Sequence, residues 1–416
     1  MIAATPAKPR GLAFVALKHS DFRFYVSGAC LSMMADNIEH VITYWVLWEK
    51  FHSPLLAGFA VISHWTPFLL FSVYFGALAD RYDCRRVIQA SQGLFMAVSV
   101  SWGVLFLTGR LEMWHAAVLL VFHGLAAALW NPGEQLILHD IVGRDHLESA
   151  VRLNATGRQL GILFGPAVGG GLLLLAGPVN GIFMNALIYL PLSLSLLRIK
   201  ANGHQQGTLT RKTSLASALQ TLSQASSNRA ILAVIAMAGI ASFFIGNYVP
   251  QMPALAGDLG GSNAERSYTM LLLASGIGGV LGGLVLEASG AIKVSLGSAL
   301  AGAVIWGAAI AGFALTRSYA AALVFLFIGG TAQLAFSSIA QTIVQLQAPP
   351  DLRGRLVGAF SMAQSGMKTG CGLTVGVAGS IVGVHTALGV SAISTAVLAL
   401  GMFAFGSAAP SPTPAY

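Results

Sequence analysis

Three ionisable residues lie within about one helical turn of each other in an apolar segment near the N-terminus. Asp36, Glu39 and His40 are spaced i, i+3 and i+4, so a helix places them on one face. A charged side chain inside a bilayer costs roughly 2.5–3.5 kcal/mol and therefore needs a reason. Two carboxylates this close are not both stable when ionised, so one is expected to take up a proton. The pattern predicts a proton carrier or a substrate contact, and a buried structural ion pair with Arg158 or Lys368 is the alternative.

Three more ionisable residues interrupt apolar segments elsewhere in the chain. Glu134 is a candidate for a second titratable site. Arg158 and Lys368 have two open roles: each contacts an anionic group of a substrate, or each neutralises one of the carboxylates described above. The sequence does not decide between these roles.

The histidines and cysteines of the apolar segments give weaker signals. His64 and His123 each stand alone, and a lone intramembrane histidine is more often a hydrogen-bonding packing residue than a titrating one. Cys30, Cys84 and Cys371 are far apart and form no CxxC pair, so they predict neither a disulfide nor a zinc site. We expect no metal and no cofactor.

The composition excludes an ordinary soluble domain. Hydrophobic residues make up 55% of the chain and charged residues only 9%, with a mean hydropathy of +0.73, whereas a soluble domain carries about 25% charged residues. The net charge of +8 does not indicate nucleic-acid binding, because the basic residues occur in short clusters between long apolar runs. Such clusters are typical of the loops of a membrane protein.

The apolar runs predict twelve membrane-spanning helices, since each span needs about 20 mostly apolar residues. The expected spans are 22–48, 55–79, 87–107, 114–138, 152–176, 179–198, 230–254, 267–288, 294–315, 319–346, 356–379 and 384–407. A polar stretch at the midpoint divides them into two groups of six. The expected organisation is a tail (1–21), a first six-helix bundle (22–198), a linker (199–228), a second bundle (229–407) and a C-terminal tail (408–416). Similar residues recur at similar spacings in the two halves, and this weak internal similarity supports a six-plus-six repeat.

The distribution of basic residues predicts the orientation. With the N-terminus inside, the inside segments hold 17 Lys and Arg residues and the outside segments hold four, namely Lys50, Arg110, Arg266 and Arg317. Positive residues concentrate on the cytoplasmic side of membrane proteins. We therefore expect an inner-membrane protein with both termini in the cytoplasm.

The loop between the second and third expected helices carries a recognisable signature. Gly76, Asp80, Arg81, Arg85 and Arg86 resemble the pattern G-x-x-x-D-R-x-G-R-R-x of the major facilitator superfamily. A carboxylate at a helix end can pair with arginines and with a neighbouring helix N-terminus, which makes a gating latch. The segment departs from the pattern at Asp83, where the family has glycine, and at Cys84. A simple positive-inside cluster would explain the arginines but not Gly76 and Asp80.

The fifth expected helix carries a second signature. Gly161, Gly165, Pro166, Gly169 and Gly170 resemble the g-x-x-x-G-P-x-x-G-G pattern of proton-antiporting exporters in the same superfamily. Glycines four residues apart form a stripe that lets another helix approach closely, and the proline can bend the helix. Glycines of the eighth expected helix offer a packing partner for this stripe.

A third set of residues resembles a branch of the superfamily that contains siderophore exporters and macrolide efflux pumps. It consists of Asn131-Pro132-Gly133-Glu134-Gln135, Asp145, Leu147, Asn154, Gly165-Pro166 and Asp351-Leu352-Arg353-Gly354-Arg355, with Ser53-Pro54 and Pro67 near the start of the chain. It departs from the branch at Glu134, where relatives often carry a basic residue.

The resemblance implies a monomeric, proton-coupled exporter of an amphipathic small molecule, in which two six-helix bundles alternate access to a central site. Import, and a membrane sensor or scaffold that transports nothing, remain alternatives. We expect no enzyme, because the chain has neither a P-loop nor a catalytic grouping. The expected partners are the substrate, protons and the lipid bilayer.

Overall fold

The computed structural model describes residues 14–201, 228–260, 263–289, 294–349 and 353–407. Within these ranges the chain is helical and forms no strand. The helices group into twelve crossings, as the apolar runs predict. The start of the N-terminal tail, most of the 199–228 linker and the 408–416 tail lie outside the described residues.

The first half contains α1 (Ser20–Phe51), α2 (Pro54–Arg81), α3 (Cys84–Thr108), α4 (Met113–Val142), α5 (Leu147–Ile188) and α6 (Leu190–Arg198). The label α5 covers two crossings, because the backbone turns at Gly177, where φ is 75° and ψ is 170°. Only glycine adopts this conformation without strain, and Pro178 follows it. The break falls where the sequence predicts the boundary between the fifth and sixth spans.

The second half contains α8 (Arg229–Ile245), η3 (Val249–Gln251), α9 (Met252–Gly260), α10 (Ala264–Ser289), α11 (Leu296–Leu315), α12 (Tyr319–Gln347), α13 (Arg353–Gly366), α14 (Lys368–Cys371), η5 (Gly372–Val377), α15 (Ala378–Val382) and α16 (Val384–Ser407). The seventh and eleventh crossings, expected as single helices, are divided into shorter pieces. In the eleventh, η5 is a π-helical stretch. Such stretches are rare and often lie at functional sites.

Seven described segments are long and apolar enough to cross a membrane on length and composition alone, and one of them contains both crossings of α5 and α6. They are Cys84–Thr108, Met113–Val142, Ser149–Arg198, Arg229–Gly260, Leu296–Leu315, Tyr319–Gln347 and Val384–Ala404. The long helix α1 is not among them. Its hydropathy is lowered by Asp36, Glu39 and His40, which lie near its middle. These polar residues belong to the site described below and do not make α1 a surface helix.

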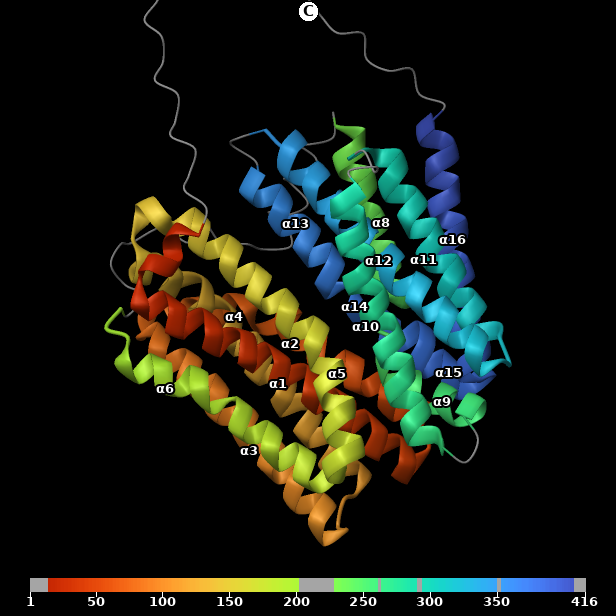
Figure 1. Ribbon diagram of the computed structural model, residues 1–416, viewed down its shortest axis with the longest axis horizontal. Coiled ribbons are helices and arrows are strands. Elements are labelled where there is room, and N and C mark those ends of the chain that lie inside the picture. The colour runs from red at the N-terminus through yellow and green to blue at the C-terminus, as the bar shows by residue number, and fades with distance from the viewer. Residues whose placement is uncertain (1–13, 202–227, 261–262, 290–293, 350–352, 408–416) are drawn as a thin grey trace, which may run out of the picture.

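The two halves lie side by side and diverge toward the end at which α1 begins and α16 ends (Figure 1). They contact each other where α1 meets α9, α2 meets η5 and α5 meets α10. At the opposite end, the amide of Gln251 donates to the carbonyl of Pro54 at 2.8 Å. Deeper in the bundle, the hydroxyl of Tyr268 donates to the carbonyl of Val41 at 3.1 Å. The Tyr268 ring also stacks on Trp45, with centroids 5.6 Å apart. The bundle is therefore held closed at the end remote from the start of α1.

Candidate functional site

Three neighbouring helices bring three histidine side chains of the first half to one level. His40 lies 11 residues before the end of α1 at Phe51, and His64 lies ten residues after the start of α2 at Pro54. His123 lies ten residues after Met113, where α4 begins on the same side. At 1.5 Å per residue, each imidazole is about 15 Å from that end of its helix. Residues distant in sequence therefore meet in the membrane interior.

His123 joins the two carboxylates of α1. Its Nε2 lies 2.8 Å from Asp36 Oδ1, and its Nδ1 lies 2.9 Å from Glu39 Oε1. All three side chains are buried, Glu39 almost completely. The alternative in which Arg158 or Lys368 neutralises these carboxylates is not what the structure shows. The side chain that contacts both carboxylates is His123. The sequence alone favours a packing role for it, because a lone intramembrane histidine more often packs than titrates.

Further polar groups tie Glu39 to the rest of the half. The hydroxyl of Ser99 on α3 donates to Glu39 Oε2, and the amide of Asn185 donates to Ser99 Oγ at 3.4 Å. Both oxygens of the Glu39 carboxylate are thus engaged. Because buried polar groups cost free energy unless they are hydrogen-bonded, this network holds α1, α3 and α4 in one arrangement.

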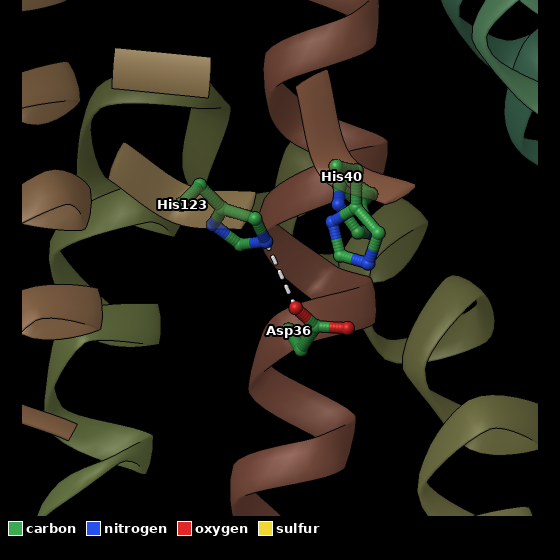
Figure 2. Close-up of side chains that lie close together, drawn as sticks. Asp36, His40 and His123 are labelled. Atoms are coloured by element: carbon green, nitrogen blue, oxygen red, sulfur yellow. Dashed lines mark hydrogen bonds and ion pairs between the residues drawn. The ribbon is translucent and has the colours of Figure 1, made fainter. Parts of the chain in front are cut away.

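His40 and His64 complete the cluster. The His40 ring centroid lies 4.8 Å from that of His123 and 4.9 Å from that of His64. One ligand atom from each of Asp36, His40, His64 and His123 lies within 4.8 Å of the others. Figure 2 shows the rings of His123 and His40 on either side of the Asp36 carboxylate, with the hydrogen bond from His123 dashed. We call these four residues the histidine cluster.

A single glycine lets α2 and α4 approach closely enough to form the cluster. A Cβ at Gly124 would lie 2.2 Å from the backbone oxygen of Ser63 and 2.9 Å from His64 Cα. No side chain fits in that space. The residue after His123 therefore sets the distance between the two helices that carry His64 and His123.

A second buried polar site lies between α4 and α5. Arg158 donates to Glu134 Oε2, and the amide of Asn154 donates to Glu134 Oε1 at 2.8 Å. Glu134 is 2% exposed, whereas the side chain of Arg158 is 31% exposed and lies over the Trp130 ring at 5.5 Å. Tyr25 of α1 lies within electrostatic range of both charges. Tyr25 precedes Asp36 by 11 residues on α1, so the two sites are about 16 Å apart.

Lys368 does not pair with a carboxylate of the first half in the described structure. Its Nζ lies 4.5 Å from the ring centroid of Trp65, the residue after His64. This cation–π contact crosses between the halves and sits just before the π-helical stretch η5. The Lys368 ammonium therefore approaches the histidine cluster without joining it.

The glycine stripe of α5 packs against the helix that carries the acidic pair. A Cβ at Gly161 would lie 2.7 Å from the Cys30 carbonyl oxygen, and a Cβ at Gly165 would lie 2.4 Å from Asn37 Cβ. The sequence predicts close packing, and Gly161 and Gly165 lie against α1. The suggested partner, the eighth span, also contacts α5: an added Cβ at its Gly276 would lie 3.9 Å from the Leu163 carbonyl oxygen. Of the signature residues, Gly170 faces that span, where an added Cβ would lie 2.4 Å from Thr269 Cγ2.

The loop between α2 and α3 is organised around Asp83. Its Oδ1 accepts from the Arg85 backbone N–H at 2.9 Å, which caps α3, and its Oδ2 lies 2.7 Å from Arg85 Nη2. Burial favours the neutral form of Asp83, but the hydrogen bonds and charge of Arg85 outweigh it and lower the pKa of Asp83 below its usual value. Arg85 also donates to the carbonyl of Ile199, the first residue of the linker. The departure from the signature at position 83 thus supplies a helix cap.

The side chains of Arg81 and Arg86 form no ion pair with Asp83 in the described structure. Arg81 lies 5.7 Å from the Tyr82 ring centroid, and Arg86 is exposed. Gly76 and Asp80 are in the last turns of α2, but their side chains lie outside the described part of the structure. The role of Asp80 as a latch therefore stays a prediction.

Sequence reasoning identified the acidic pair but missed its partners. His64, His123 and Ser99 come from three other helices, and no local spacing connects them to Asp36. The position of each histidine along its helix could have identified it. His64 and His123 each lie ten residues after the start of their helices, which is the level of His40 in the bundle.

Twelve apolar crossings in two groups of six, with ionisable side chains bonded to each other inside, define a multi-pass membrane transporter of the major facilitator type rather than an enzyme. The family described as "transmembrane secretion effector" (MFS_3) matches residues 12–410, and the chain belongs to it.

Two curated relatives are similar in sequence. The multidrug efflux pump Tap of Mycolicibacterium fortuitum is 26% identical over 390 residues, which cover 90% of this chain and 93% of that protein. The staphyloferrin A transporter of Staphylococcus aureus is 22% identical over 149 residues, 36% of this chain and 38% of the other.

Solved structures share the fold at low identity. A bacterial homologue of the human lysosomal transporter Spinster, in an inward-facing and unoccupied conformation, has a TM-score of 0.72 at 14% identity and covers 93% of this chain and 97% of its own. The nucleoside transporter NupG has a TM-score of 0.70 at 12% identity, with coverage of 94% and 100%.

Proposed function

We propose that this chain exports an amphipathic small molecule, a siderophore-like metabolite or a drug, across the inner membrane in exchange for protons. The observation that carries the proposal is the buried Glu134–Arg158 pair. Its acid is enclosed, whereas its base is partly exposed and rests on the Trp130 ring. An ionisable pair inside a membrane bundle is costly and marks a substrate or proton path.

The pair provides the competition that antiport requires. A donor group of the substrate and a proton both bind the Glu134 carboxylate, so one displaces the other. Arg158 can withdraw toward solvent while it keeps its contact with Trp130. A proton arriving from outside neutralises Glu134 and releases the substrate there, and the deprotonated carboxylate reloads when the site faces inward. Asn154, which donates to Glu134 Oε1, holds the carboxylate in place.

The direction of transport draws support from three sources. The family description names secretion, and a relative similar along nearly the whole chain is an efflux pump. The glycine stripe of α5, which resembles the exporter signature, packs on α1. The 17-to-4 distribution of basic residues supports cytoplasmic termini. On this orientation the described state, closed at the end remote from the start of α1, faces the cytoplasm. We propose that a monomer suffices, because the twelve crossings complete both bundles.

The role of Asp36 and Glu39 as a proton-carrying pair stays a prediction. His123 contacts both carboxylates, so they are not the isolated pair from which that role was predicted. Glu134 is the better candidate for coupling.

Coupling is tested in inside-out membrane vesicles with ethidium as the probe, because uptake into such vesicles corresponds to export. We expect a proton gradient to drive ethidium accumulation, and Glu134→Gln to reduce it to the level seen after the gradient is collapsed with nigericin. Glu49→Gln is the matched control, since Glu49 is exposed at the outer end of α1. Full gradient-driven accumulation by Glu134→Gln would overturn the coupling role.

Direction and substrate are tested by metabolite profiling of a deletion strain and its parent, in iron-rich and iron-starved media. A compound retained in the mutant cells and missing from the medium supports export and identifies the substrate. A compound left in the medium makes the protein an importer. No difference in either compartment, together with no ethidium flux, favours the sensor or scaffold.

A further inference from the structure

The histidine cluster has the donor set of a transition-metal site. Three imidazoles and one carboxylate approach from α1, α2 and α4, and their ligand atoms lie within 4.8 Å of one another. Nitrogen-rich sites with a single carboxylate oxygen are typical of Zn²⁺ and its divalent neighbours, whereas Mg²⁺ and Ca²⁺ prefer oxygen ligands. The donors are buried or half-buried, which excludes a casual surface cluster.

Glu39 supplies the support that a metal-binding histidine usually has. A ligating imidazole commonly donates its other ring N–H to a carboxylate, which fixes the tautomer and the ring orientation. His123 Nδ1 lies 2.9 Å from Glu39 Oε1, so its Nε2 points to Asp36. Ser99 in turn donates to the other Glu39 oxygen. Glu39 is thus positioned behind His123 rather than among the ligands.

An unsatisfied nitrogen points to a missing ligand. His64 is 8% exposed, and its Nδ1 has no hydrogen-bond partner among the described residues. A buried polar atom without a partner costs about 1–3 kcal/mol, so native proteins rarely leave one. Its neighbours are the His40 and His123 rings, with centroids 4.9 Å and 5.4 Å away. A metal ion shared by these rings would satisfy it.

Charge and geometry fit a divalent ion. Asp36 and Glu39 carry two negative charges when ionised, and one divalent cation balances them with all three histidines neutral. In a tetrahedral site with bonds of about 2.0–2.1 Å, ligand atoms are roughly 3.3 Å apart. The widest pair in the cluster must therefore converge by about 1.5 Å, which side-chain rotation supplies. Lys368 of the other half lies over Trp65 and outside the ligand set.

We infer that Asp36, His40, His64 and His123 bind one divalent transition-metal ion of the Zn²⁺ class, and that Glu39 positions His123 for it. The ion clamps α1, α2 and α4 together at the middle of the first half. This site goes beyond the proposed export function and does not depend on its direction, its substrate or Glu134.

The test uses the full-length protein, purified in detergent through a tag without histidine and stripped with a chelator. Co²⁺ is the probe, because tetrahedral Co²⁺ absorbs visible light, and Zn²⁺ is then added to displace it. We expect one Co²⁺ per chain, displacement by Zn²⁺, and a rise in apparent melting temperature with either ion. Mg²⁺ should produce none of these effects.

Three variants locate the ion. Glu39→Gln keeps an acceptor for His123 but loses the charge, so affinity should fall about 10- to 100-fold. His64→Gln removes a ligand and should lower affinity further, and it should also weaken the visible absorption. His385→Gln is the control, because His385 lies in the second half, against Asp258 at 3.0 Å. Elution volume and circular dichroism verify that each variant is folded.

Two results would overturn the inference. One is wild-type protein that binds no Co²⁺ at a ratio of one per chain. The other is folded His64→Gln protein that binds Co²⁺ with unchanged affinity and spectrum, which would place the ion elsewhere. Ethidium transport by Glu134→Gln is measured separately, so a failure of the export proposal leaves this result unaffected.

Discussion

Gly165→Ala tests whether the seam between α1 and α5 is as tight as the contacts indicate. The added Cβ would lie 2.4 Å from Asn37 Cβ and 3.1 Å from the Met34 carbonyl oxygen, whereas ordinary contacts begin at 3.4 Å. The two helices must therefore separate by about 1 Å. Overpacking of this size costs about 1–3 kcal/mol, and the better helix propensity of alanine returns about 0.5–1 kcal/mol. We expect a net loss of up to about 2.5 kcal/mol.

The assay is thermal unfolding of the purified protein in one detergent, at one scan rate, because unfolding of such proteins is often irreversible. If the first half unfolds as a unit, each kcal/mol corresponds to about 2–4 °C in the apparent melting temperature. Gly171→Ala is the matched control on the same helix, because nothing lies within 4 Å of its added Cβ. The control should be neutral or slightly stabilising. Equal melting temperatures for the two variants would refute the argument that this stripe sets the helix distance.

Two further predictions concern the cap of α3 and the close approach of α2 to α4. Asp83→Ala removes the cap of α3 and the partner of Arg85, and should cost about 0.5–2 kcal/mol in chemical or thermal unfolding. Because the pKa of Asp83 is lowered in the folded protein, its charge contribution is present above the unfolded value of about 3.9 and is lost as the pH falls through the folded value. Asp83→Asn should keep the cap and abolish that pH dependence, and unchanged acid sensitivity would count against the assignment. Gly124→Ala places a Cβ 2.2 Å from the Ser63 oxygen and should cost about 1–3 kcal/mol and weaken Co²⁺ binding. Gly93→Ala, with nothing within 4 Å, should change neither, so a parallel loss in both variants would refute the reasoning.

The element pattern was predictable because each crossing needs its own apolar run. The Gly177-Pro178 break is local, so sequence alone places it between the fifth and sixth spans. The pieces α13, α14, η5 and α15 were not predictable, because the apolar run continues through them. Close approach of η5 to α2 decides their shape: a Cβ at Gly376 would lie 2.2 Å from Gly58 Cα. That contact joins residues more than 300 positions apart, and no local rule contains it.

The candidate site was predictable only where its residues share a helix. Asp36, Glu39 and His40 are one turn of α1, so spacing alone places them together. His123 is 87 positions from Asp36, and its role depends on how α4 packs against α1 and α2. The same holds for Arg158. Its charge suggested a partner for Asp36 or Glu39, but helix depth places it beside Glu134 instead.

The distribution of these contacts bears on how the two halves move against each other. In the first half, hydrogen bonds among buried polar side chains link α1, α3 and α4, and the glycine stripe locks α5 onto α1. In the described part of the second half, Lys368 is a half-buried charged residue inside a crossing, and it lies between α13 and the π-helical stretch η5. A half held by a buried network resists deformation, whereas a crossing divided into short pieces bends at its joints. Alternation of access should therefore move the first half as a rigid body and concentrate the internal change in the eleventh crossing, next to the cation that contacts Trp65.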